Sequence, residues 1–333
     1  MRPTRLRSWW LTVGVLTGGE LLQTVQADEA LPPHESCEMH RLASVNLKRA
    51  STGSVLAPVS INGVAAYMYI EIANHLSMIT QEAVDQMKLP VKAFGPGVEA
   101  FSGSQKVLNY ASIHDFAVGE LAFRDPGLLI DPQITKSARD DSDVVVGVLG
   151  NGLLWTMDLE LDLAAGKLNF YEPGKCTRPV YWATEFEVVP LQRNPLGEFF
   201  FPMKLDGRKI EATFSTGTTV STLSTDVTKR VYGFDKDSDG IETQKNSDGM
   251  VVASYRAMKM STSGLSVIDE RVRLVDPPHR CQLTRKGDVI GYTGCLYFYP
   301  LTLGNSILEH LHIYIDTKAN RMYYTDAGNR PAH

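Results

Sequence analysis

Cysteine is scarce in this chain, and metal-binding spacings are absent from it. The 333 residues include only four cysteines, and no two of them have the Cys-x-x-Cys spacing of a zinc site or a redox dithiol. Basic runs are missing beyond the first residues, and a net charge of −5 gives no attraction to nucleic acid. After the N-terminal segment, no stretch is apolar for long enough to cross a bilayer. We therefore expect no metal, no cofactor and no nucleic-acid partner.

The composition that remains is typical of a globular protein. Hydrophobic residues make up 43% of the chain and charged residues 21%, which is too apolar for a disordered protein. A length of 333 residues is enough for two domains with sizeable cores.

The first 27 residues have the three parts of a secretory signal peptide. They begin with three arginines, continue with an apolar stretch at 9–16, and end on the small residues around Ala27. We expect cleavage after Ala27 and export to the periplasm or the extracellular space. The alternative is a retained anchor that tethers the protein to a membrane. The apolar stretch is short and Glu20 follows it closely, which favours cleavage.

Four cysteines in an exported protein predict two disulfides. Three pairings are possible. We expect Cys37–Cys176, which would tie the start of the first half of the chain to its end. We also expect Cys281–Cys295, which would close a short local loop.

The sequence contains an internal duplication. Residues 58–79 align with residues 202–223 without a gap at an offset of 144. This alignment places Gly63 on Gly207 and Glu71 on Ser215. Since a repeated pattern of this length reports a repeated structural unit, we expect two lobes of one plan.

A second gapless match extends the duplication at an offset of 154. It places Gly150-Asn151 on Gly304-Asn305, in segments that each end with a predicted hairpin. We therefore divide the chain by number into a signal peptide at 1–27, a polar leader at 28–54, a first lobe at 55–177, a linker at 178–186 and a second lobe at 187–330.

The local patterns predict a mainly β protein. Asn62-Gly63 and Asp206-Gly207 are strong hairpin signals, and alternation of apolar and polar residues dominates both halves. Helical patterns are short, near 80–87 and 225–231. In each half, the second strand of the hairpin leads into a turn, at Glu71 or at Ser215.

These motifs resemble the retropepsin-like and pepsin-like aspartyl proteases, in the two-lobed, single-chain form found in exported bacterial proteins. The resemblance implies a closed β-barrel fold with one catalytic aspartate on each lobe, at the start of an Asp-Thr-Gly motif. This chain has Glu71-Ile72-Ala73 at the first place and Ser215-Thr216-Gly217 at the second. Glu71 and Ser215 therefore stand where the family has its two catalytic aspartates.

The substitutions argue against the activity that the fold usually carries. Two neighbouring carboxyls share one proton in this chemistry, and a serine hydroxyl does not titrate near neutral pH. Ile72 lacks the hydroxyl with which threonine braces the two turns, and Ala73 adds a Cβ where glycine allows a close approach. The expected contact of Glu71 is a hydrogen bond with Ser215, Thr216 or nearby backbone N–H groups.

Three functional hypotheses follow. The first is an exported, catalytically impaired homologue that binds an extended peptide or a protein partner between its lobes. His75 and a flap at 99–107, with Phe101 and Gly103 near its tip, would border that cleft. The second is an active aspartic-type endopeptidase with an altered site that uses Glu71. The third is a structural envelope protein that binds nothing there.

Overall fold

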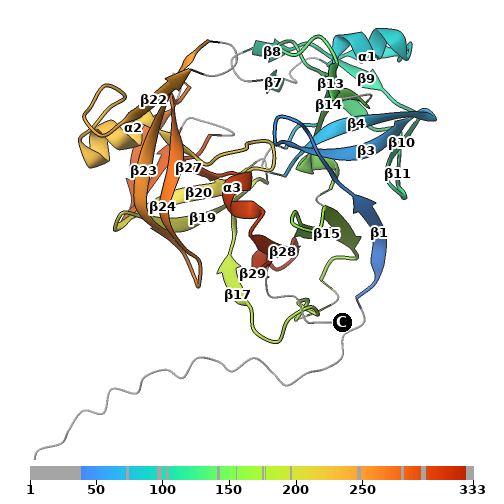
Figure 1. The fold of residues 1–333 in the computed structure, drawn as a ribbon. Helices are drawn as coiled ribbons and strands as arrows, with labels where there is room; N and C mark the ends of the chain where they lie inside the picture. The colour runs from blue at the N-terminus through green and yellow to red at the C-terminus, as the bar shows by residue number, and fades with distance from the viewer. Residues whose placement is uncertain are drawn as a thin grey trace, which may run out of the picture. The chain divides into compact units, whose positions relative to one another are not determined.

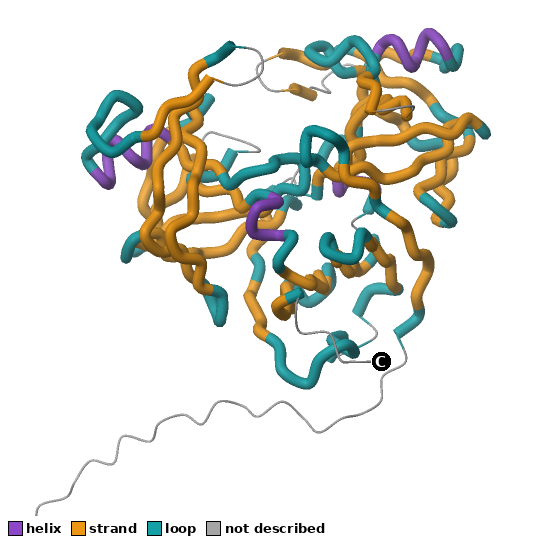
Figure 2. Tube along the Cα trace, viewed as in Figure 1, coloured by secondary structure: helices purple, strands orange, loops and turns teal. Residues whose placement is uncertain are grey.

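The protein is described as a computed structural model. The described residues are 39–72, 75–95, 100–102, 105–140, 143–154, 156–174, 176, 178–195, 197–245, 249–278, 281–293 and 298–327. Strands dominate these residues and the helices are short, as Figure 1 and Figure 2 show. The expected mainly β class is confirmed. The predicted signal peptide lies outside the described residues.

The first lobe is built on an 11-stranded sheet. At its centre, β3 (Val55–Ile61) and β4 (Val64–Glu71) form an antiparallel hairpin. Asn62 and Gly63 join the two strands with φ angles of 48° and 82°, the left-handed values of a tight hairpin turn. The other strands are β2 (Lys48–Arg49), β5 (Met78–Ile79), β6 (Val91–Ala93), β9 (Asn109–Ser112), β10 (Asp115–Val118), β11 (Leu121–Arg124), β12 (Gly127–Ile130), β13 (Ala138–Asp140) and β14 (Asp143–Gly150).

The second lobe is built on a ten-stranded sheet. Its central hairpin is β19 (Phe199–Leu205) and β20 (Arg208–Phe214), joined by Asp206 and Gly207 with φ angles of 45° and 85°. The other strands are β18 (Gln192–Arg193), β21 (Thr222–Ser224), β22 (Glu242–Lys245), β23 (Val251–Ser261), β24 (Ser266–Val275), β25 (Gln282–Lys286), β26 (Val289–Thr293) and β27 (Leu301–Leu303).

Four successive strand pairings are the same in both lobes. In the first lobe, β3 pairs antiparallel with β4, β4 parallel with β14, β14 antiparallel with β5, and β5 parallel with β12. In the second lobe, β19, β20, β27, β21 and β24 pair in the same order and with the same directions. The duplication seen in the sequence is therefore a duplication of topology.

The two lobes differ in closure. In the second lobe β19 pairs with both β20 and β23, so six strands form a closed ring, in the order β19, β23, β24, β21, β27 and β20. In the first lobe, the described strands form an open path from β11 to β6. The closed barrel expected for both lobes is thus found in the second alone among the described strands. The reason lies in the long β23–β24 hairpin, whose far end reaches back to β19.

A six-stranded sheet combines segments from both halves of the chain. Its order is β1 (Arg41–Asn46), β16 (Lys167–Tyr171), β15 (Asp158–Asp162), β28 (Leu311–Asp316), β29 (Arg321–Asp326) and β17 (Glu187–Pro190). The closing hairpins of the two halves meet where β15 pairs antiparallel with β28. The segment expected to be a polar leader contributes β1 to this sheet and β2 to the first lobe.

The remaining elements are small. A separate two-stranded hairpin consists of β7 (Ala100–Ser102) and β8 (Gln105–Val107). One cluster of buried apolar side chains runs through both lobes, and a second, mainly aromatic cluster packs on the six-stranded sheet. The helical segments are α1 (Gln81–Gln86), a 3-10 turn η1 (Asn151–Leu153), α2 (Thr225–Val227), a π-helical turn η2 (Thr228–Tyr232) and α3 (Asn305–Leu308).

Candidate functional site

The structure brings the two motif turns together. Glu71 is the last residue of β4, and Ser215 directly follows β20. The hydroxyl Oγ of Ser215 donates a hydrogen bond to Oε2 of Glu71. The expected contact between these two positions, 144 residues apart in the sequence, is therefore present.

The carboxylate of Glu71 is held by two donors on one oxygen. Oε2 accepts from the hydroxyl of Ser215 and from the backbone N–H of Gly217, the latter at 3.0 Å. Hydrogen bonds to an ionised carboxylate are about twice as strong as neutral ones. A hydroxyl has a single proton, and that of Ser215 is committed to Glu71. The pair thus contains one titratable group, in contrast to the two carboxyls of an aspartic protease.

Glycine at position 217 makes room for the longer side chain of Glu71. A Cβ added at Gly217 would lie 2.2 Å from Oε2 of Glu71, far inside van der Waals contact. The carboxylate of Glu71 therefore occupies space that the Cβ of any other residue at position 217 would need. The glycine retained in the second motif and the glutamate in the first are sterically matched.

Half of the threonine brace between the turns is retained. Thr216 is completely buried, and its Oγ1 donates to the carbonyl of Ile70 at 2.6 Å. The same Oγ1 accepts from the backbone N–H of Ile72 at 3.3 Å. Ile72 has no hydroxyl to return these bonds, and its side chain is buried in the apolar core. The turns are therefore braced from the second lobe.

Two asparagine side chains bind the backbone of the turns, a role that the sequence did not predict. Nδ2 of Asn151 donates to the carbonyl of Ile72 at 2.7 Å, and Nδ2 of Asn305 donates to the carbonyl of Thr216 at 3.0 Å. The duplication aligns the two asparagines, and it also aligns the two carbonyls that they bind. Equivalent serines add a second pair of bonds: Ser77 Oγ accepts from the N–H of Gly150 at 3.0 Å, and Ser221 Oγ accepts from the N–H of Gly304 at 3.1 Å.

A second carboxyl, Glu198, links the lobes near this site. Glu198 directly precedes β19, and its side chain is fully buried. Its Oε1 accepts from the backbone N–H of His75 at 3.3 Å, and its Oε2 accepts from Nδ2 of Asn194 at 2.8 Å. Burial raises the pKa of Glu198 to about 7. The charge of Glu71 also raises this pKa, whereas the two hydrogen bonds lower it. Sequence periodicity gave no signal for this contact, because it joins residues of different lobes.

His75 lies in the first motif turn and is half-buried. Its backbone carbonyl accepts from the N–H of Gly152 at 3.0 Å. Burial lowers the pKa of its imidazole, so the ring is neutral at pH 7. In this structure the backbone of His75 connects the first motif turn to Glu198 and to η1.

Several predicted residues fall outside the described part of the chain. They include Ala73, Gly103, Cys37 and Cys295, together with the side chain of Phe101. The backbone of Phe101 belongs to the β7–β8 hairpin, at the place expected for a flap. No described cysteine is free, but the expected pairings of Cys176 and Cys281 stay predictions because their partners lie outside the described residues.

The described residues contain neither a membrane-spanning helix nor a metal-holding cluster. No helix in that part of the chain is long and apolar enough to cross a membrane. No group of three or more histidine, cysteine, aspartate or glutamate side chains there is arranged to hold a metal ion.

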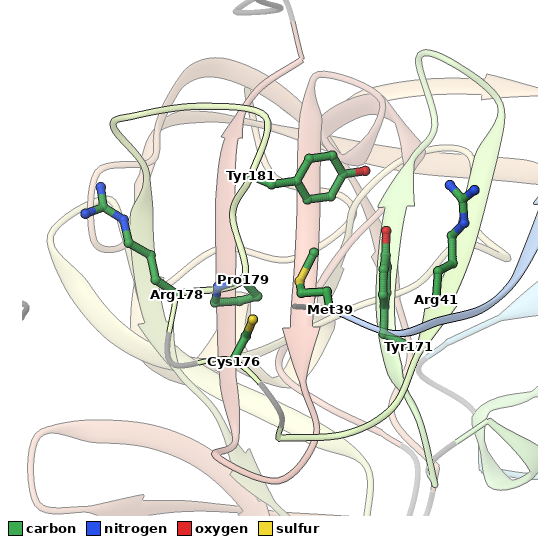
Figure 3. A pocket seen from close by; sticks show the side chains of 7 residues that line it. All are labelled: Met39, Arg41, Tyr171, Cys176, Arg178, Pro179 and Tyr181. Atoms are coloured by element: carbon green, nitrogen blue, oxygen red, sulfur yellow. The ribbon is translucent and has the colours of Figure 1, made fainter. Parts of the chain in front are cut away.

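A cavity of about 460 Å³ lies on the six-stranded sheet, away from the motif turns. Figure 3 shows Tyr171 and Tyr181 in its lining, between Arg178 and Arg41. The hydroxyls of both tyrosines donate to the buried carboxylate of Glu160, at 2.6 Å and 3.0 Å. These polar groups therefore serve the packing of the sheet. No motif residue lines the cavity.

Comparison with known proteins gives likenesses of structure alone. No protein-family model matches the chain, and no curated protein matches it significantly. The chain is similar to the crystal structure of an aspartic proteinase from Irpex lacteus, with 10% identity and a TM-score of 0.49 over 85% of this chain and 97% of that one. It is also similar to the crystal structure of basic 7S globulin from soybean, with 10% identity and a TM-score of 0.46 over 86% of this chain and 97% of that one. The resemblance of the fold to pepsin-like proteins is thus found again in solved structures, and at these scores it carries no argument about activity.

Proposed function

We propose that this chain is an exported protein that binds an extended peptide, or an extended segment of a protein partner, between its lobes without hydrolysing it. The proposal rests on the hydrogen bond from Ser215 to Glu71, because this bond joins the two turns and only one of the two motif positions carries a carboxyl. Export rests on the signal-like pattern of the first 27 residues.

The chemistry of the turns favours binding over hydrolysis. An aspartic protease uses one ionised carboxyl as base and one protonated carboxyl as acid. At the two motif positions of this chain, the acid would have to be Ser215, whose proton is already donated to Glu71. The N–H of Gly217 donates to the same oxygen of Glu71. The carboxyl of Glu71 is therefore engaged by the second motif turn.

The retained architecture favours a binding role over a purely structural one. The brace of Thr216 and the bonds of Asn151 and Asn305 hold both turns in place although no catalysis depends on them. An extended peptide can bind to the exposed edge of a strand by main-chain hydrogen bonds, and this binding needs no catalytic group. The β7–β8 hairpin supplies such an edge.

The test is a binding experiment with a defined probe. A fluorescently labelled, reduced and carboxymethylated protein serves as an unfolded ligand, and its anisotropy is measured against increasing concentrations of the chain. We expect saturable binding, with hydrogen-exchange protection of β7–β8 and of residues 215–218. Absence of saturable binding, or protection confined to other elements, would contradict the proposal.

A further inference from the structure

A cluster of cationic side chains surrounds the β19–β20 hairpin of the second lobe. Four cations, Lys204, Arg208, Lys209 and Arg285, line one cavity of about 270 Å³, and Asp288 is the one carboxylate in its lining. The whole chain has a net charge of −5. The cluster is therefore a local reversal of the charge of the molecule.

The positions of the two lysines in this cluster lower the stability of the sheet. Lys204 and Lys209 are direct partners in the antiparallel ladder of β19 and β20, so their side chains extend from the same face. Like charges directly opposite each other destabilise a sheet. Lysine often protects an exposed sheet edge from aggregation. Protection of an edge can explain the charge of Arg285, which lies on the edge strand β25. It does not explain Lys204 and Lys209, because β19 and β20 are inner strands with partners on both sides.

The nearby carboxylates neutralise little of this charge. Nζ of Lys209 pairs with Oδ2 of Asp288 at 2.6 Å, and this contact lowers the pKa of Asp288. Asp206 lies in the hairpin turn, and its carboxylate accepts hydrogen bonds from the hydroxyl of Tyr255 at 2.6 Å and from the backbone N–H of Lys259 at 2.7 Å. Within the described part of the chain, no ion pair is formed by the remaining three cations, Lys204, Arg208 and Arg285.

An apolar cavity adjoins the cationic one. It has a volume of about 390 Å³, and Lys204 and Lys209 line both cavities. Such a volume lies in the range of small-molecule sites. The backbone of Ser261 pairs with that of Lys204, and residues 261–263 line the apolar cavity, where the hydroxyl of Thr262 donates to the carbonyl of Pro202 at 3.4 Å. The apolar part of the lining consists of Val189, Pro190, Pro202, Met203 and Val289.

We propose that these two adjoining cavities form one binding site for an anionic ligand that carries a phosphate or sulfate ester group on an apolar body. The ester group would lie over Lys204 and Lys209, where ammonium groups act as point-charge donors to its oxygens. The apolar body would fill the neighbouring cavity between β17, β19 and β26. This site is separate from the motif turns, and the proposal does not depend on peptide binding there.

Titration calorimetry on the full chain tests the site with three probes. These are 2-naphthyl phosphate, which has both features, inorganic phosphate, which has the charge alone, and 2-naphthol, which has the apolar body alone. We expect saturable one-to-one binding of 2-naphthyl phosphate that is at least about tenfold tighter than binding of either partial probe, since the two contributions add. Equal affinity for all three probes, or no binding of the first, overturns the proposal.

Matched variants locate the binding. Lys204→Gln removes one charge-assisted contact and is expected to weaken 2-naphthyl phosphate binding by about tenfold or more. Lys92→Gln is the control, because Lys92 is exposed on β6 of the other lobe. Circular dichroism establishes that both variants keep the fold. Binding that is equally strong in both variants overturns the proposal.

Vesicle sedimentation identifies the source of the ester group. Vesicles of phosphatidylglycerol and of phosphatidylcholine are compared for the wild type and for Lys204→Gln. Retention by phosphatidylglycerol vesicles that is lost in Lys204→Gln supports the site with a lipid headgroup as its ligand. Binding of 2-naphthyl phosphate without vesicle retention supports the site with a soluble ester. Absence of both overturns the proposal.

Discussion

Replacing Glu198 by glutamine tests the electrostatics of the contact between the lobes. Glu198 is fully buried, and its oxygens accept from the N–H of His75 and from Asn194. Its pKa rises from an ordinary 4.5 to about 7, with burial as the main cause and the charge of Glu71 as a further one. Ionisation of this carboxyl is therefore disfavoured in the folded state.

The size of the effect follows from this shift. Between about pH 4.5 and about pH 7, the folded state binds a proton on Glu198 that the unfolded state has released. The free energy of unfolding therefore decreases as the pH rises through this window. A shift of two to three pKa units corresponds to about 3 kcal/mol, at 1.36 kcal/mol for each unit.

Urea unfolding at about pH 5 and about pH 8 measures this contribution. Glu198→Gln is expected to reduce the loss of stability between the two pH values by about 3 kcal/mol relative to the wild type. The amide also disturbs a hydrogen bond, but that cost is the same at both pH values. Glu120→Gln serves as the control, because Glu120 is exposed beside the β10–β11 turn. An unchanged pH dependence in Glu198→Gln would show that Glu198 does not titrate with a raised pKa in the folded state.

Three further substitutions test the turns and their support. Thr216→Val leaves the carbonyl of Ile70 and the N–H of Ile72 without their buried partner, so urea unfolding should show a loss of about 2–4 kcal/mol; a loss below 1 kcal/mol would contradict the brace. Gly147→Ala places a Cβ 2.1 Å from the backbone carbonyl oxygen of Met78, and should lower the free energy of unfolding by about 3 kcal/mol or more, or prevent folding. A wild-type melting temperature would show that β5 and β14 are less tightly packed. Ser215→Asp restores a second carboxyl, yet little peptidase activity is expected because the brace from the first lobe is still missing; strong activity would show that the first turn is competent.

Local and repeated features were predictable from the sequence. Asn-Gly and Asp-Gly permit the positive φ angles of a tight hairpin, and the turns at 62–63 and 206–207 have these angles. The two gapless offsets predicted equivalent segments in both halves, and the four shared strand pairings confirm them. The contact between Glu71 and Ser215 followed from the same alignment.

Contacts between the halves were not predictable in the same way. The pairing of β15 with β28 joins the closing hairpins of both halves, although each segment alone reads as the end of its own lobe. Glu198 meets His75 across 123 residues of sequence, and no local pattern marks a glutamate for burial beside a backbone N–H. The steric match of Gly217 to Glu71 likewise depends on the approach of two separate turns. Such features arise from the packing of the lobes, which periodicity does not encode.

We expect the pair of Glu71 and Ser215 to support binding but not hydrolysis. The most direct measurement is mass spectrometry of an unfolded protein after incubation with the chain, from acid to neutral pH, beside Glu71→Gln treated identically. We predict that the wild type produces no cleavage above that of Glu71→Gln at any pH. Cleavage by the wild type that disappears in Glu71→Gln would contradict the account.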